Sequence, residues 1–178
     1  LVHRSVPEEK IEVIYNWCDE GQFPKAPKNE SLAKELGFSG RFNVLFAGTM
    51  GKAQALEAVL DAAARIGGRI PEIQFVFAGG GIDVDRLQEI ARERRLNNVL
   101  FLSRRPVSEI GEILNLADVL LVHLKDDPLF RITIPSKIQA YLAVGRPILM
   151  GVRGDAENLV RAAGAGSSIS VSSIDVVR

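Results

Sequence analysis

The chain has a single cysteine and no excess of charge of either sign. Cys18 stands alone among 178 residues, which excludes an internal disulfide and a cysteine-based zinc site and indicates a reducing compartment. Lysine and arginine together number 22, as do aspartate and glutamate, so the charge balance favours neither nucleic acid nor an anionic membrane surface as a partner. We therefore expect a cytoplasmic protein that does not bind nucleic acid.

Long apolar runs and catalytic motifs are also missing from the sequence. No stretch approaches the ~18 apolar residues of a membrane span, and residues 1–7 lack the apolar core of a signal peptide. There is no HExxH motif, no nucleophile elbow and no cluster of metal ligands. His123 lies in an apolar run and is expected to be a buried core residue. The sequence thus predicts no metal and no membrane span, and it identifies no catalytic residue.

From Phe42 onward, apolar runs of strand length alternate with segments of helical period. Continuous apolar runs are typical of parallel strands that are buried on both faces. The expected strands cover residues 43–47, 74–78, 98–102, 119–124, 147–150 and 168–171, and the expected helices cover residues 31–36, 51–66, 84–95, 109–116, 135–145 and 155–163. This alternation predicts an α/β fold, a doubly wound, Rossmann-like parallel sheet of about six strands with helices on both faces.

The chain divides near residue 40. Residues 1–40 are expected to form an N-terminal strand over the apolar run Ile11 to Tyr15, then a polar linker and a short helix. Residues 41–178 are expected to form the sheet domain. Because the chain begins without Met, we expect it to be a fragment of a longer protein. In a doubly wound sheet, ligands bind outside the carboxyl ends of the strands, so the loops that follow strands are the candidate sites.

One short helix with marked ends is predicted between Ile134 and Pro147. Pro135 suits the first helical position, and Gly145 suits the left-handed residue that closes a helix. An alternative start makes Ser136 the N-cap, with Gln139 completing a capping box. Both alternatives leave the backbone amides at the helix start without partners inside the helix.

Those free amides belong to Ser136, Lys137 and Ile138, and they could bind an anion. Lys137 places a cation at the positive end of the helix dipole, where an acid would be favoured by roughly 0.3 to 1 kcal/mol. A bound phosphate would reverse that preference. We therefore predict a phosphate site at this helix start.

Two glycine-rich loops follow the first two strands of the domain. In the first, Gly48 and Gly51 allow a close backbone approach to a ligand, and Lys52 is a second cation at a helix start. The spacing of these glycines excludes a P-loop. In the second, Gly80 lies between two further glycines, but Val84 stands where a dinucleotide motif requires glycine, so an NAD site is not expected.

Two later loops contribute arginines at strand ends. Arg104 follows the third strand, and Arg131 lies in a long loop that leads into the Ser136 helix. Together these loops predict a phosphate-binding platform without a self-contained reaction centre.

The chain also carries an ordered series of short motifs: VIYNWCD at 13–19, VLFAG at 44–48, FVFAGGG at 75–81, VLFL at 99–102, ADV at 117–119, PSK at 135–137 and AVGRP at 143–147. This series resembles the C-terminal, donor-binding domain of group 1 (family 4) glycosyltransferases, in the form found in bacterial surface-polysaccharide enzymes. The resemblance covers nearly the whole chain. It implies a GT-B fold whose second domain binds a nucleotide-sugar, commonly UDP-linked, as the substrate and without a cofactor.

The resemblance also implies roles for individual residues. Lys52 matches the family's diphosphate-binding lysine, while Thr49 stands in the loop where the family has an arginine. The family's paired glutamates would fall near Ile132 and Ala140, and neither position is acidic. Lys137 would supply the missing positive charge. Arg104 lies where the family's main chain contacts the nucleobase.

In this family, chemistry occurs between two domains, and the acceptor-binding domain should precede Leu1. The resemblance therefore implies that the chain is the donor-binding half of an enzyme that transfers sugar to a glycan or lipid-linked acceptor, that it is inactive alone, and that the full-length protein is cytoplasmic, with a peripheral position at the inner membrane. A sugar-nucleotide epimerase of GT-B architecture and a non-catalytic nucleotide-binding module are the two alternatives.

Overall fold

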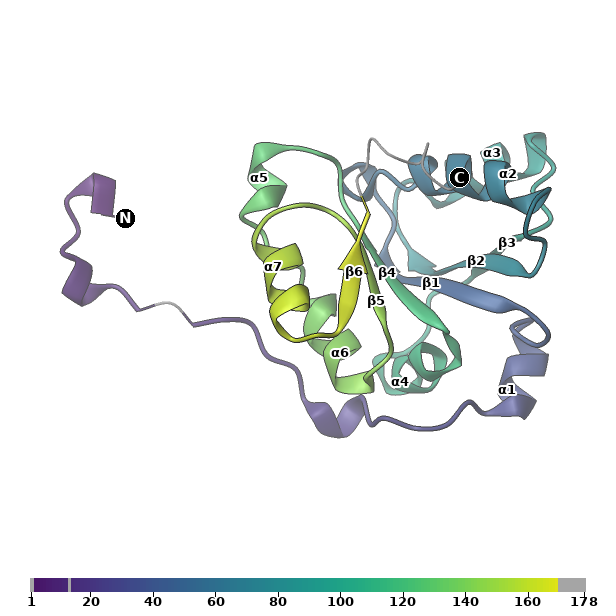
Figure 1. Cartoon of the computed structure of the whole chain (residues 1–178), viewed down its shortest axis with the longest axis horizontal. Coiled ribbons are helices and arrows are strands. Elements are labelled where there is room, and N and C mark those ends of the chain that lie inside the picture. Colours follow the sequence, from purple (N-terminus) through teal and green to yellow (C-terminus); the bar gives the residue numbers. More distant parts are fainter. Residues whose placement is uncertain (1, 13, 170–178) are drawn as a thin grey trace.

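A computed structural model describes residues 2–12 and 14–169 and shows one six-stranded sheet in which every pairing is parallel (Figure 1). The strand order is β3-β2-β1-β4-β5-β6. The strands are β1 (Phe42–Thr49), β2 (Ile73–Gly80), β3 (Val99–Leu102), β4 (Val119–His123), β5 (Ile148–Gly151) and β6 (Gly166–Ser168). The order reverses between β1 and β4, which confirms the predicted doubly wound fold.

Helices cover both faces of the sheet and bury two apolar clusters. The α2 (Glu57–Gly67) and α3 (Val84–Glu93) helices pack on one face, against a cluster that includes Phe46 and Phe77. On the other face lie α1 (Glu30–Glu35), α4 (Val107–Leu116), α6 (Lys137–Val144) and α7 (Asp155–Ala162). The short α5 (Pro128–Arg131) lies in the loop after β4. None of the described helices is both long and apolar enough to span a membrane.

The helix predicted over residues 51–66 is interrupted. A short 3-10 helix, η4 (Lys52–Gln54), precedes α2, and Ala55 between them has a left-handed backbone with φ of 46°. The Gln54 side chain accepts a hydrogen bond from the Gly51 N–H at 3.0 Å. These local bonds close the first turn before α2 begins, and the helical period could not show this break.

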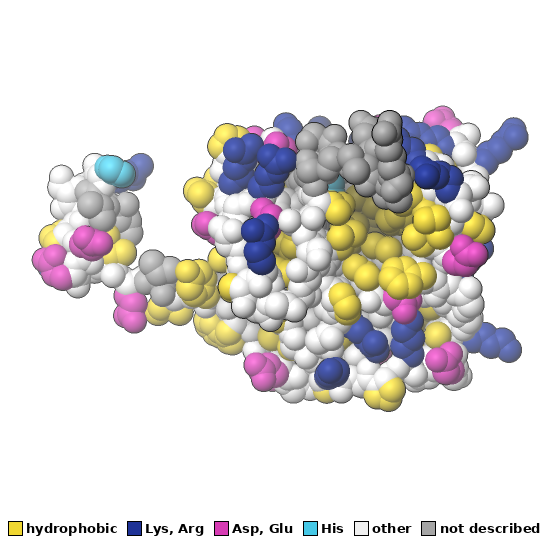
Figure 2. Space-filling model, viewed as in Figure 1, with side chains coloured by type: hydrophobic (Ala, Val, Ile, Leu, Met, Phe, Trp, Pro, Cys, Tyr) yellow, Lys and Arg dark blue, Asp and Glu magenta, His cyan; other side chains and the backbone are white. Residues whose placement is uncertain are grey.

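The N-terminal strand prediction is wrong for the residues that the structure describes. Besides α1, residues 2–12 and 14–40 hold three short 3-10 helices, η1 (Val2–Arg4), η2 (Glu8–Lys10) and η3 (Glu20–Gln22), and no strand. Ile14, Tyr15 and Trp17 are 77%, 66% and 83% exposed. They belong to residues 2–12 and 14–19, here called the arm, whose beginning stands clear of the body (Figures 1 and 2). A strand needs a paired neighbour, and none of the described strands pairs with this apolar run. Val13, which belongs to the run, lies outside the described residues.

The last predicted strand, residues 168–171, lies two residues earlier in the structure. It is the three-residue β6, which pairs with β5 and ends at Ser168. Residues 170 and 171 lie outside the described residues.

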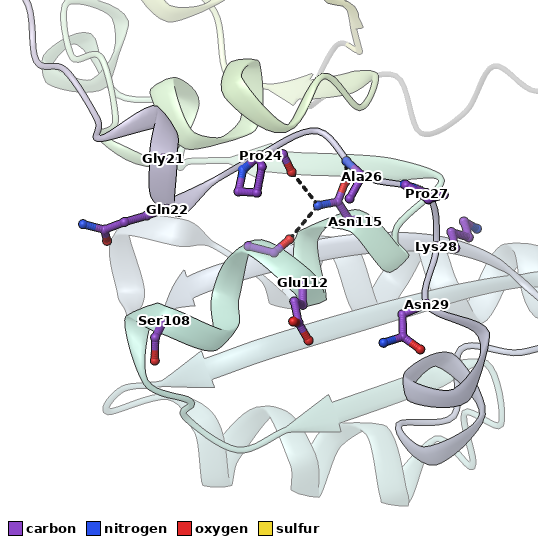
Figure 3. Close-up of a pocket in the computed structure, with 11 residues that line it drawn as sticks. Gly21, Gln22, Pro24, Ala26, Pro27, Lys28, Asn29, Ser108, Glu112 and Asn115 are labelled. Atoms are coloured by element: carbon purple, nitrogen blue, oxygen red, sulfur yellow. Dashed lines mark hydrogen bonds between the residues drawn. The ribbon is translucent and has the colours of Figure 1, made fainter.

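Residues 20–29, here called the strap, cross the outer side of α4 (Figure 3). Buried Asn115 points from α4 to the strap and makes two bonds to it: its Oδ1 accepts from the Ala26 N–H at 3.1 Å, and its Nδ2 donates to the Pro24 carbonyl at 2.9 Å. Nearby, Lys28 pairs with Asp118 at 2.5 Å. The strap and α4 enclose a cavity of about 660 Å³, which none of the predicted site residues lines.

Candidate functional site

The candidate site lies where β1 and β4 diverge. β1 pairs with β4 only at Val44 and Leu45, but it pairs with β2 along its whole length, as far as Thr49 opposite Gly80. Beyond Leu45 the β4 side of β1 is therefore unpaired. This divergence opens the crevice in which a doubly wound sheet binds its ligand.

Tyr141 of α6 occupies the unpaired side of β1 at Ala47. Its hydroxyl accepts a hydrogen bond from the Ala47 N–H at 3.0 Å and donates one to the Ala47 carbonyl at 3.2 Å. The Ala47 N–H and carbonyl point toward the side of β1 where β4 no longer pairs. Buried backbone groups without a partner are costly, so the hydroxyl takes the place of the missing strand. The side chain is fully buried, and burial raises the pKa of Tyr141 far above its usual range. Tyr141 thus fastens α6 to the end of β1.

Lys137 lies one turn before Tyr141, on the same side of α6. Its Nζ lies 3.5 Å from the centre of the Phe46 ring, which belongs to the cluster on the opposite face of the sheet. A Cβ at Gly48 would be 2.9 Å from Nζ, so glycine is the residue that leaves room for it. Nζ is buried and has no hydrogen-bond partner among the described residues. Burial lowers the pKa of Lys137 to about 7.

The glycine-rich loops after β1 and β2 pack backbone against backbone. A Cβ at Gly79 would lie 2.1 Å from the Gly48 carbonyl oxygen, and one at Gly81 would lie 2.1 Å from the Met50 carbonyl oxygen. The Met50 N–H donates to the Gly80 carbonyl at 2.8 Å. Only residues without a side chain permit this approach, and the result is a fixed platform of main-chain groups.

This platform forms the floor of a cavity of about 360 Å³. The cavity is lined by Gly48, Thr49, Ala78, Gly79, Gly80, Gly81, Arg104, Arg105 and Ile110. A second cavity of about 670 Å³ shares the two arginines and the second glycine loop and extends to Asp85 and Gln88 of α3. The two cavities adjoin at the strand ends and share the two arginines. They therefore suit a ligand with an anionic group in one cavity and the rest of the molecule in the other.

Comparison with known proteins identifies the family. A profile of the family described as "Glycosyl transferases group 1" matches residues 28–176. The chain belongs to the group 1 glycosyltransferases. "Probable glycosyltransferase WbjE" of Pseudomonas aeruginosa is 28% identical to it over 145 residues, which is 81% of this chain and 36% of that protein. The chain thus spans about a third of the length of this curated relative.

Solved structures share the fold of this glycosyltransferase chain. Anabaena Alr3699/HepE in complex with UDP and glucose has a TM-score of 0.76 and 20% sequence identity, with 95% of this chain and 45% of that chain covered. WaaG, a glycosyltransferase involved in lipopolysaccharide biosynthesis, has a TM-score of 0.77 and 16% identity, with 97% and 47% covered. The predicted Rossmann-like, GT-B type of fold is thereby confirmed.

The candidate site brings together only some of the predicted residues. Gly48, Thr49, Gly80 and Arg104 line the smaller cavity, and Lys137 lies directly behind Gly48. These residues come from four separate segments of the sequence. Their convergence follows from the parallel topology, which brings every strand's carboxyl end to one edge of the sheet.

Other predicted residues lie away from the cavity. Lys52 is exposed and lines a different space between η4, α2 and α3. Arg131 is exposed on α5 and pairs with Asp126 at 2.9 Å. Gly51 lies beside Gln54 and Ile82 rather than in the cavity wall.

The helix start decides between the two predicted alternatives. Ser136 is the N-cap and α6 begins at Lys137, so Pro135 does not occupy the first helical position. The Ser136 backbone is helical and its side chain makes no capping bond, so the capping box is wrong. Ile138 is fully buried in the apolar cluster, and its N–H donates to the Pro135 carbonyl at 3.0 Å, so the prediction of a free amide at this residue is wrong. At the other end, Gly145 closes α6 in the left-handed conformation with φ of 68°, as predicted.

Arg105 and Tyr141 are the side chains of the site that the sequence did not single out as site residues. The Arg105 Nε is buried without a partner among the described residues, and its guanidinium lies 3.5 Å from the Glu109 carboxylate. For Arg105 the sequence did carry a signal, because it directly follows the predicted site residue Arg104. Tyr141 gave none, because a tyrosine on the apolar side of a helix is usually core.

His123 is buried, as predicted, at the end of β4. Its Nδ1 lies 2.7 Å from the Gln54 carbonyl, and burial lowers its pKa. No group of three or more His, Cys, Asp or Glu side chains that could hold a metal occurs in residues 2–12 and 14–169. The contact between His123 and Gln54 ties β4 to η4.

We expect the Tyr141→Phe variant to be less stable by about 1–3 kcal/mol, because the Ala47 N–H would stay buried without an acceptor. Urea denaturation of both proteins measures this difference. A control is Tyr15→Phe on the exposed arm, which should change the free energy of unfolding by less than about 0.5 kcal/mol. Equal stabilities of Tyr141→Phe and the parent protein would contradict the role of the hydroxyl.

Proposed function

We propose that the cavity beside Gly48 binds the diphosphate of a nucleotide-sugar, and that the whole protein transfers this sugar to a glycan or lipid-linked acceptor. The observation that carries the proposal is the Lys137 Nζ, a buried amino group without a partner in the described residues, placed against the cavity floor. A buried charge needs a counter-charge. A diphosphate would supply it.

The surroundings of Lys137 support the same ligand. The main-chain platform of Gly48 and Gly80 allows phosphate oxygens to approach the backbone closely, and Arg104 and Arg105 add cations at the other wall. The larger cavity on the far side of these arginines is the proposed place of the nucleoside. HepE, which shares the fold, is described in complex with UDP and glucose, so we propose a UDP-sugar as donor.

Catalysis in this proposal is positional and electrostatic. Cations and main-chain N–H groups around the diphosphate stabilise the charge that develops as the nucleoside diphosphate leaves. Membership in a transferase family favours this activity over the epimerase and the non-catalytic module. We also propose that an acceptor-binding domain completes the enzyme, that this chain alone does not catalyse transfer, and that the complete protein is cytoplasmic and lies at the inner membrane.

Binding of UDP to this chain is the direct test. A hundredfold excess of UDP over its Kd should add about 2.7 kcal/mol to the stability and raise the melting temperature by roughly 5–10 °C. Lys137→Met should weaken the binding of UDP by about tenfold or more and leave that of uridine unchanged, because only UDP presents phosphates to Nζ. Differential scanning fluorimetry and isothermal titration calorimetry measure these effects.

A matched control is Lys34→Met on α1, whose lysine is exposed and does not line the cavity. This variant should bind UDP like the parent protein. Failure of millimolar UDP to raise the melting temperature would refute the proposed donor. Equal losses of UDP and uridine in Lys137→Met would refute the phosphate role of Lys137.

A further inference from the structure

The Lys137 ammonium would be poorly solvated in the empty site. Its Nζ lies between the Phe46 ring and the backbone of Gly48 and is buried from solvent. The ring face attracts a cation by about 0.5–2 kcal/mol, which is far less than the cost of removing an ammonium from water. The neutral amine avoids most of that cost.

No acidic side chain on the elements around Lys137 compensates its charge. On α6 itself the other titratable group is Tyr141, which is bound to Ala47. The ends of β1 and β3 contribute only cations, Lys52 and the arginines 104 and 105. The end of β4 contributes His123, whose Nδ1 lies against the Gln54 carbonyl.

The acids nearest along the chain are already engaged or exposed. In the connection from β4 to α6, Asp126 pairs with Arg131 at 2.9 Å, and Asp127 accepts a hydrogen bond from the Leu129 N–H at 2.9 Å. Asp155 at the start of α7, Glu112 on α4 and Asp85 on α3 are exposed. Glu109 on α4 lies 3.5 Å from Arg105, and Asp83 lines the separate space that Lys52 lines. Within the described residues, therefore, an anion for Nζ has to come from a ligand.

We propose that, in weakly alkaline solution, Lys137 is uncharged while the site is empty and gains a proton when a diphosphate occupies the site. This inference rests on the proposed function, because the diphosphate is its ligand. The proton comes from solvent and adds to the lone pair of Nζ, and the resulting ammonium faces the anion beside Gly48. Donor binding and proton uptake are then one coupled event.

The direction of the coupling follows from the two states of the lysine. Burial lowers the pKa of Lys137 to about 7, and an adjacent diphosphate would raise it again. Below about pH 7 the ammonium is present in both states, so affinity does not depend on this group. Above about pH 7 the empty state has lost the proton and the bound state keeps it, so affinity falls by up to about tenfold for each pH unit.

Calorimetric titration of this chain with UDP at about pH 8, in two buffers that differ in ionisation enthalpy, measures the proton uptake. The terminal phosphate of UDP has a pKa near 6 and is already ionised at this pH, so the ligand contributes little. We expect an uptake close to one proton per UDP bound. We also expect the affinity to fall between about pH 7.5 and pH 8.5.

Two variants separate the charge from its titration. Lys137→Arg carries a charge at every accessible pH and should bind UDP with almost no proton uptake. Lys137→Met removes the titratable group and should lose both the uptake and most of the affinity. Each variant has a readout that does not depend on the other one folding well.

The possible results are distinguishable from those for the proposed function. UDP binding by the parent protein without proton uptake would overturn this inference and leave the donor site standing. Uptake of about one proton by Lys137→Met would assign the proton to another group and overturn it as well. Absence of UDP binding to the parent protein would overturn both.

Discussion

The Gly79→Ala variant is expected to lose both stability and UDP binding. Gly79 has φ of 141°, a conformation that costs a residue with a side chain about 1–3 kcal/mol. The added Cβ would also lie 2.1 Å from the Gly48 carbonyl oxygen, so the two loops would have to separate. We expect the free energy of unfolding to fall by about 3 kcal/mol or more, and UDP affinity to fall by at least tenfold. Urea denaturation and calorimetry measure the two losses.

Gly68→Ala is the matched control for this change. Gly68 ends α2 with φ of −84°, and a Cβ there would meet no atom within 4 Å. This variant should be as stable as the parent protein or more stable by about 0.4–1 kcal/mol. If Gly79→Ala behaved like Gly68→Ala, the close packing of the glycine loops would not be the basis of the site.

The Asn115→Ala variant is expected to release the strap from α4. It removes the two hydrogen bonds from α4 to the strap, in which Asn115 accepts from the Ala26 N–H and donates to the Pro24 carbonyl. It also removes the bond that Asn115 donates to the Gly111 carbonyl within α4. Each partner left unsatisfied costs about 1–3 kcal/mol, so we expect a loss of about 2–4 kcal/mol. Amide hydrogen exchange should accelerate in residues 20–29 and much less in the central strands β1 and β4.

Lys28→Met provides the comparison on the same segment. It breaks the ion pair with Asp118. Because both side chains of this pair are about a quarter exposed, the free energy of unfolding should fall by less than about 1 kcal/mol. Exchange in the strap should then stay close to that of the parent protein. If Lys28→Met freed the strap and Asn115→Ala did not, the ion pair rather than the amide would hold it.

The sheet could be predicted from the sequence because each central strand is a continuous apolar run. The runs at β1 and β2 are buried on both faces, so the pattern needed no knowledge of their partners. The exposed arm with Ile14 and Trp17 also carries a short apolar run, and there the same rule failed. The apolar pattern indicates which segments could form a strand. Whether a strand forms also depends on a neighbouring strand that it can pair with.

The site could be predicted only in part for a similar reason. Glycines and cations after strands marked the correct edge of the sheet, and Lys137 was found from its mismatch with the helix dipole. The direction of its side chain was not foreseen, since it passes behind Gly48 instead of pointing out of the helix start. Lys52 shares that mismatch but lies on the outer side of η4. Side-chain direction depends on packing that local sequence does not contain.

The buried position of Lys137 implies a trade-off between donor binding and thermal stability. An amine that is buried without a partner in the described residues lowers the stability of the empty protein at neutral pH, and an apolar side chain of similar length would remove this burden. Selection of variants for melting temperature alone would therefore favour replacement of Lys137, whereas selection in the presence of the donor would retain it. A library screened under both regimes should diverge first at this position.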